Sequence, residues 1–172
     1  MTVSGFVVHE GRVALHWHRK IGKWLPAGGH IEEGEGPVEA VLREVREEFA
    51  IEAEVMLIAP RVDYRSGGPT QIEPPVAVLE YEPEPGHFHI DLVYFLRALS
   101  GYPGVCHDPE NPIHWLEAAD LASGAWTQEG VERTLAPDVQ ALGLEALRQA
   151  MVVRIRTSIP KRLRRLEQRT TC

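Results

Sequence analysis

A glycine turn that leads into an acidic helix, between Gly29 and Ile51, constrains this chain more than any other feature of its sequence. The pattern reads Gly29-x5-Glu35-x7-Arg43-Glu44-Val45-x-Glu47-Glu48-x-Ala50-Ile51. On an α-helix, positions i, i+3 and i+4 are neighbours, so Glu44, Glu47 and Glu48 share one face. Like charges at this spacing repel each other by roughly 0.2–0.5 kcal/mol per pair, which disfavours a purely structural helix. A hard cation such as Mg²⁺ would turn that repulsion into coordination by oxygen ligands.

This segment resembles the Nudix box, which reads Gly-x5-Glu-x7-Arg-Glu-U-x-Glu-Glu-x-Gly-U, where U is a bulky aliphatic residue. The first glycine, the arginine and all four glutamates match. At roughly 5–7% usage of each residue type, six chance matches at one start have a probability on the order of 10⁻⁷. The last glycine of the box is Ala50 here. A glycine would end the helix with a positive φ, so Ala50 predicts a slightly different exit.

The resemblance to the Nudix (MutT-like) hydrolases implies a reaction and a set of site residues. The reaction is Mg²⁺-dependent hydrolysis, with Mn²⁺ as a substitute, of a diphosphate linkage in a nucleoside diphosphate joined to another moiety X. The implied catalytic residues and metal ligands are Glu44, Glu47 and Glu48, with the carbonyl oxygen of Gly28 as a further metal ligand. The implied supporting residues are Gly29, Glu35 and Arg43. Arg43 also lies four residues before Glu47, a spacing that predicts a salt bridge.

Three alternative functions remain open at this level. One is a (d)NTP pyrophosphohydrolase of the house-cleaning type, and another is a non-catalytic Nudix domain that senses a nucleotide. Non-catalytic versions usually lose box carboxylates, and this chain keeps all of them. The third is an isoprenoid diphosphate isomerase on the same scaffold. That enzyme would need a catalytic cysteine, and neither Cys106 nor the terminal Cys172 is well placed for one.

Residues outside the box suggest where the substrate binds. Alternation along a strand places His87, His89 and Asp91 on one face. The stretch resembles a Nudix branch that carries His-x-Asp on this strand and whose substrates are mostly unassigned. The candidate substrate-binding residues are Arg19, Lys20, His30, His89 and Asp91. His89 and Asp91 are expected to touch substrate phosphates or a metal-bound water. Trp17, Trp24 and Tyr94 are candidates to stack on a base.

Hydrophobic patterns predict one α/β domain. Apolar runs over 2–9 and 12–19, separated by Glu10-Gly11, predict a β-hairpin. Further strands are predicted at 54–64, 76–81, 87–99 and 113–116, a helical turn at 117–123 and an amphipathic helix at 137–153. The segment 21–30 is predicted to be a loop. The helix that starts at Pro37 has a buried stripe of Val38, Val41, Leu42, Val45 and Phe49. Strands interrupted by helices suit an α/β/α sandwich, with the mixed central sheet and packed box helix that the resemblance implies.

Charge is distributed unevenly along the chain. Residues 148–172 hold eight arginines and lysines against one glutamate, a net charge of +7, whereas residues 1–147 carry −14. We therefore predict a Nudix hydrolase domain over 1–150 and a basic C-terminal tail or helix over 151–172. No aromatic residue is interleaved with these basic residues, so base stacking and a nucleic-acid partner are disfavoured.

Composition limits the partners and the compartment. No run of 18 apolar residues is present, so no membrane span is expected, and the first residues do not resemble a signal peptide. The chain has two cysteines, which form no disulfide framework and favour a reducing cytoplasm. The expected partner is a small molecule derived from a nucleotide, and the resemblance also allows a homodimer.

Overall fold

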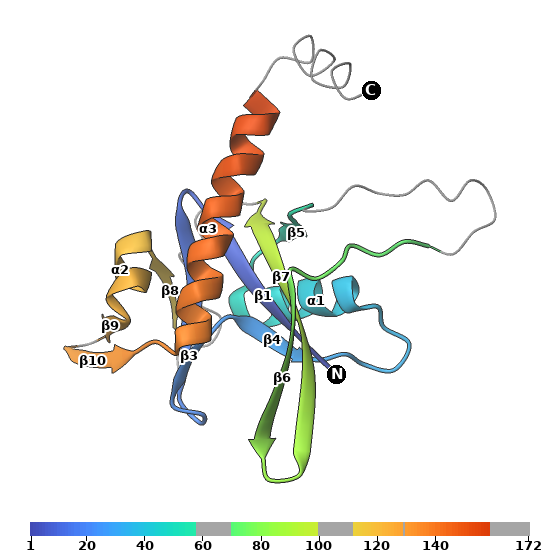
Figure 1. Ribbon diagram of the computed structural model, residues 1–172, viewed down its shortest axis with the longest axis horizontal. Coiled ribbons are helices and arrows are strands. Elements are labelled where there is room, and N and C mark those ends of the chain that lie inside the picture. Colours follow the sequence, from blue (N-terminus) through green and yellow to red (C-terminus); the bar gives the residue numbers. More distant parts are fainter. Residues whose placement is uncertain (58–69, 100–111, 129, 159–172) are drawn as a thin grey trace, which may run out of the picture.

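The computed structural model describes residues 1–57, 70–99, 112–128 and 130–158 (Figure 1). These residues form an α/β/α sandwich, in which a mixed sheet lies between helix α1 on one face and helices α2 and α3 on the other. The helices are α1 (Pro37–Phe49), α2 (Ala118–Ser123) and α3 (Pro137–Ser158). The strands are β1 (Thr2–His9), β2 (Arg12–His18), β3 (Lys23–Leu25), β4 (Ala27–His30), β5 (Ala53–Val55), β6 (Ala77–Glu84), β7 (His87–Ala98), β8 (Ile113–Leu116), β9 (Ala125–Gln128) and β10 (Val131–Thr134).

Strand β1 is the centre of the sheet. It pairs antiparallel with β2 and β4 and parallel with β7, which in turn pairs antiparallel with β5 and β6. The predicted hairpin between β1 and β2 is confirmed, and its turn residues Glu10 and Gly11 have φ values of 45° and 80°. Two successive positive φ values are typical of a type I′ turn, whose twist matches that of the strands.

Helix α1 begins and ends as its sequence dictates. Pro37 occupies the first turn, and the N–H of Gly36 donates to the Glu39 carboxylate at 3.0 Å, which satisfies a backbone donor at the helix start. Ala50 ends the helix with φ 53° and ψ 34°, and its N–H donates to the carbonyl of Arg46. The predicted change of exit is therefore wrong, because the alanine adopts the left-handed conformation that favours glycine. That conformation costs an alanine roughly 1–2 kcal/mol.

Alternate residues of β1 and β7 face opposite layers. Val3 and Val7 of β1 and Leu96 of β7 pack against α1, together with the buried Val41, Val45 and Phe49 of that helix. The neighbouring side chains face α2 and α3 on the other side of the sheet, where they form a second core of Phe6, Val8, Val93, Phe95, Leu121 and Val139. Both layers are apolar, so burial of apolar surface holds the three helices to the sheet.

Several predictions of local structure need correction. The segment 21–30 is not a loop, because it contains β3, which pairs with β2, and β4, which pairs with β1. Strands of three and four residues are too short to show an alternating pattern, so the sequence did not predict them. The hairpin of β9 and β10 was not predicted from its short, polar strands. Helix α3 continues to Ser158, past the predicted end of this helix at residue 153.

Parts of other predictions lie outside the described residues. These are the rest of the strand predicted at 54–64, the loop with Cys106, and the tail from residue 159 with Cys172. The described helices include none that is long and apolar enough to cross a membrane.

Candidate active site

The three box carboxylates lie on the side of α1 that faces strand β4. The Glu48 carboxylate accepts a hydrogen bond from the N–H of Gly28 at 3.0 Å. The Glu44 side chain is 13% exposed and lies against Gly29, whereas the Glu47 side chain is 59% exposed. Glu44 and Glu48 are therefore partly buried, whereas Glu47 is exposed to solvent.

Two glycines make this close approach of strand and helix possible. A Cβ atom added to Gly29 would lie 2.3 Å from Oε1 of Glu44, and one added to Gly28 would lie 2.4 Å from the carbonyl oxygen of Val3. Both distances are shorter than van der Waals contact. Gly29 thus leaves room for a carboxylate, and Gly28 leaves room for the neighbouring strand β1, as glycines do where a backbone must approach closely.

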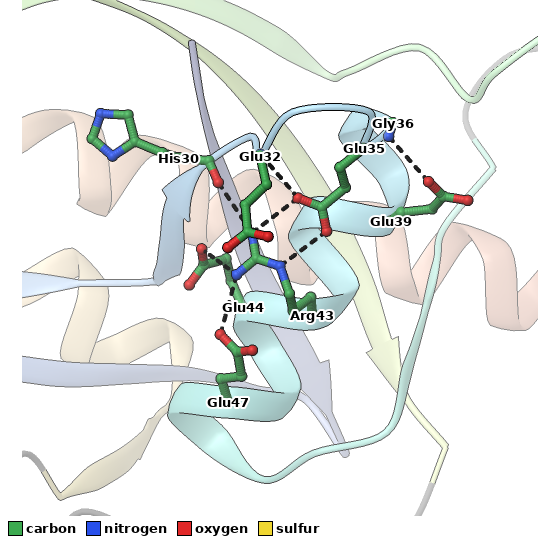
Figure 2. A network of polar contacts seen from close by, with 8 residues as sticks. All are labelled: His30, Glu32, Glu35, Gly36, Glu39, Arg43, Glu44 and Glu47. Atoms are coloured by element: carbon green, nitrogen blue, oxygen red, sulfur yellow. Dashed lines mark hydrogen bonds and ion pairs between the residues drawn. The ribbon is translucent and has the colours of Figure 1, made fainter.

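Arg43 ties the box together (Figure 2). Its guanidinium donates to both oxygens of Glu35 at 2.9 and 3.0 Å, to Glu44 at 2.8 Å and to Glu47 at 3.1 Å. A further bond, at 3.0 Å, goes to the backbone carbonyl of His30 at the end of β4. The predicted Arg43–Glu47 salt bridge is confirmed. Such a fork of fixed donors holds several carboxylates in defined positions at once.

Glu48 differs electrostatically from its neighbours. Burial raises the pKa of Glu48 to about 7, the hydrogen bond from Gly28 opposes this rise, and the negative charges of Glu44 and Glu47 add to it. The site therefore carries negative charge that its own residues compensate only partly. A cation placed among the three carboxylates would relieve that repulsion.

The residues fit a divalent cation in donor type. Among the described residues, no three acidic, histidine or cysteine side chains already converge on one point. However, the hydrogen bonds from Arg43 and Gly28 use one oxygen each of Glu44, Glu47 and Glu48, so each carboxylate keeps a second oxygen that bonds no other described residue. Hard cations such as Mg²⁺ take carboxylate oxygens and retain several waters, so few protein ligands are required.

A large cavity of about 1120 Å³ lies on the other face of the sheet, under α3. The apolar part of its lining consists of Phe6, Ile21, Leu25, Pro26, Leu79, Pro83, Val93, Ala136, Val139 and Leu142. The polar and charged part consists of Ser4, His18, Lys20, Lys23, His30, Tyr81, Glu82, Glu84, His87, His89, Asp91 and Asp138. A concave site with an apolar wall and convergent polar groups is a candidate site for a small molecule.

His30 connects the carboxylates to this cavity. Its backbone carbonyl accepts the bond from Arg43, while its imidazole lines the cavity and meets the ring of His89 at 5.1 Å between ring centres. His89 in turn contacts His87, with 2.9 Å between their Nε2 atoms, and Tyr81, with 3.2 Å between Nδ1 and the hydroxyl oxygen. The polar end of the cavity thus adjoins the strand that carries Gly28 and Gly29.

Lys20 and Lys23 are available to bind an anion. Neither lysine forms an ion pair with a described residue, and both are exposed at the cavity. In contrast, Arg12, Arg46 and Arg97 are each neutralised by a glutamate. In a body of strongly negative net charge, unpaired cations beside a cavity indicate a place for anionic groups.

The structure brings together most of the predicted site residues. Lys20, His30, His89 and Asp91 line the cavity, but Arg19 is exposed and is not among its lining residues. Trp24 and Tyr94 have no exposed surface, so neither is free to stack on a base. His87 and Lys23 also line the cavity. Tyr81 and Ser4 line it too and were not predicted, and alternation along their strands was the only signal for them.

Comparisons with known proteins agree with this geometry. A family model described as NUDIX domain matches residues 1–137. A hydrolase of the NUDIX family from Clostridium perfringens is 28% identical over 85% of this chain and 94% of its own, with a TM-score of 0.66. Two further solved structures share the fold. A UDP-X diphosphatase is 17% identical over 90% of this chain and 63% of its own, with a TM-score of 0.55. The E. coli dihydroneopterin triphosphate pyrophosphohydrolase is 17% identical over 86% of this chain and 92% of its own, with a TM-score of 0.52. No curated protein matches the chain.

Proposed function

Because the chain belongs to the NUDIX family and is a hydrolase, we propose that it hydrolyses the diphosphate linkage of a nucleoside diphosphate joined to another moiety, with Mg²⁺ as its cofactor. The observation that carries this proposal is the arrangement around β4. Glu44 and Glu48, each with an unused oxygen, lie against Gly29 and Gly28 of this strand, and Arg43 links Glu47 to Glu44. The last residue of the strand, His30, lines a cavity with unpaired lysines.

The residues present would hold the metal as follows. Glu44, Glu47 and Glu48 would supply carboxylate oxygens. In an antiparallel strand, the N–H and C=O of one residue point to the same side, and the N–H of Gly28 points to Glu48. The carbonyl of Gly28 is therefore aimed toward the carboxylates and is suited to be a further ligand. When bound, Mg²⁺ neutralises phosphate charge, orients the substrate and activates a water.

Arg43 and Glu35 would position the ligands rather than bind the metal. Arg43 holds Glu44 and Glu47 on one side and Glu35 and the His30 backbone on the other. Glu48 is held instead by the N–H of Gly28, which leaves its second oxygen for the metal. Glu44, which is half-buried beside Gly29, would hold the attacking water or serve as a ligand.

The substrate would span from the carboxylates to the cavity. Lys20 and Lys23 are the leading contacts for phosphate oxygens, in preference to Arg19, which does not line the cavity. His30 accepts a bond from Arg43 and also lines the cavity, so it would contact the part of the substrate next to the cleaved bond. His89, whose ring meets that of His30, would contact the substrate farther into the cavity. The moiety that is not cleaved would occupy the apolar part of the cavity.

A screen tests this proposal. Nucleotide sugars, dinucleoside polyphosphates, ADP-ribose, CDP-alcohols and (d)NTPs are incubated with Mg²⁺ or Mn²⁺, and the products are separated. Release of a nucleoside monophosphate and a phosphorylated X supports the proposal, whereas pyrophosphate from a triphosphate identifies the house-cleaning alternative. If no panel member yields a phosphate-containing product, the proposed reaction is wrong.

Two expectations from the sequence belong to this proposal. The cysteine content favours a reducing cytoplasm, and relatives suggest a homodimer. Size-exclusion chromatography with light scattering, on the full chain, measures the oligomeric state directly. A measured mass equal to one chain at all protein concentrations would exclude a homodimer.

A further inference from the structure

Asp91 is a buried carboxylate at the floor of the cavity. The residue is 5% exposed, and its Oδ1 accepts a hydrogen bond from the Thr2 hydroxyl at 2.8 Å. Parallel pairing of β1 with β7 places Thr2 directly opposite Asp91. In the described part of the chain, Asp91 has no ion pair with any basic side chain, and its second oxygen has no hydrogen-bond partner.

A buried carboxylate needs hydrogen-bond donors. Burial raises the pKa of the Tyr81 hydroxyl, and the nearby Asp91 adds to this rise against the hydrogen bond with Thr2, so Asp91 and Tyr81 are close neighbours. Thr2 satisfies one oxygen of Asp91. Because Asp91 lines the cavity, a molecule bound there can supply a donor to the other oxygen.

The side chains beside Asp91 are hydrogen-bonding groups in fixed positions. The His89 imidazole contacts the Tyr81 hydroxyl through one nitrogen and His87 through the other. Burial, with the neighbouring His87 and His30, lowers the pKa of His89, and Asp91 opposes this change. An imidazole, a phenol and a carboxylate together offer both acceptors and donors at short range.

This environment disfavours a phosphate at the floor of the cavity. A phosphate oxygen next to Asp91 would place two negative charges together in a buried site, whereas the unpaired Lys20 and Lys23 attract phosphates at the cavity edge. Hydroxyl groups fit best, because each one donates to a carboxylate and accepts from an imidazole or a phenol.

We propose that Asp91, together with His89 and Tyr81, binds the hydroxyl groups of a sugar ring in the substrate, and so determines specificity for that ring. This rests on the proposed function and revises the expectation that Asp91 touches substrate phosphates. The sugar is either the ribose of the nucleoside or a glycosyl group in the moiety X, since both present vicinal hydroxyls.

Equilibrium binding to the full chain tests the proposal. Titration calorimetry in EDTA, where no hydrolysis occurs, compares UDP with 2′,3′-dideoxy-UDP, ADP with 2′,3′-dideoxy-ADP, and UDP-glucose with UDP. The first two comparisons detect a ribose contact and the third detects a glycosyl contact. Asp91→Asn turns the free oxygen into an amide and should weaken binding of the hydroxyl-bearing member of one pair by about 10- to 100-fold. Binding of the member that lacks the hydroxyls should be unchanged.

Two further variants separate recognition from structure. Thr2→Val removes the hydrogen bond to Asp91 but leaves the carboxylate, so it should lower the melting temperature and affect both members of each pair alike. Asp120→Asn is the matched control, because Asp120 lies in α2, outside the cavity, and an amide oxygen can still accept from the N–H of Glu117. It should leave all affinities unchanged.

The outcomes distinguish this inference from the proposed function. Selective loss in Asp91→Asn supports the sugar contact. Equal loss for both members of every pair, no loss in any pair, or no binding of any hydroxyl-bearing probe to the wild type overturns it. If selective binding is found but no substrate is hydrolysed with Mg²⁺, the proposed reaction fails while the sugar contact stands.

Discussion

Replacing Glu48 by glutamine tests the electrostatics of the carboxylate site without a substrate. Burial and two neighbouring carboxylates raise the pKa of Glu48 from 4.5 to about 7, against the bond from Gly28. A tenfold change in proton affinity corresponds to about 1.4 kcal/mol. The folded protein in EDTA should therefore be destabilised by roughly 3 kcal/mol once Glu48 is fully ionised.

The direction with pH follows from proton binding. Between pH 4.5 and about 7, the unfolded chain has lost the proton of Glu48 while the folded chain keeps it. Stability from this group is therefore present at low pH and is lost as pH rises to about 7. Glutamine carries no charge and keeps an oxygen to accept from Gly28. The free energy of unfolding of the variant should exceed that of the wild type by under about 1 kcal/mol at pH 5 and by roughly 3 kcal/mol at pH 8.

Urea unfolding of both proteins in EDTA, from pH 5 to pH 8.5, measures this difference, because the other titrating groups contribute equally to each. Glu47→Gln is the control: its side chain is 59% exposed and its bond to Arg43 is at the surface, where ion pairs contribute about 0–1 kcal/mol. A Glu48→Gln difference that does not change with pH, or a wild type that is the more stable at pH 8, would refute the reasoning. With Mg²⁺, the same variant should lose several orders of magnitude in turnover.

Other predictions concern the backbone around the site and the metal. Gly29→Ala should fold but lose at least about tenfold in kcat, since its Cβ would meet Glu44 at 2.3 Å; normal kinetics with a native circular dichroism spectrum would contradict this. Gly28→Ala would meet the backbone of Val3 at 2.4 Å and should cost about 1–3 kcal/mol in urea unfolding. Ala50→Gly relieves a left-handed alanine and should add about 0.5–1 kcal/mol to the free energy of unfolding, and an unchanged midpoint would exclude that strain. EDTA should abolish turnover and Mg²⁺ or Mn²⁺ should restore it; activity that persists in EDTA would remove the metal from the proposal.

The sequence by itself determined the features that depend on near neighbours in the chain. Pro37 and the helical spacing predicted the start of α1, its buried stripe and its carboxylate face, because each depends on residues at most four positions apart. Alternation along β7 likewise placed His87, His89 and Asp91 on one face of the sheet.

The tertiary structure decided which groups meet across the sheet. Thr2 contacts Asp91 only because β1 pairs in parallel with β7, 89 residues later in the chain, and Trp24 proved to be core rather than a stacking surface. Strand register depends on the packing of both faces at once, so no local pattern reveals it. The box residues and their spacing were therefore readable in the sequence, whereas the cavity beside them, with a carboxylate at its floor, exists only in the folded protein.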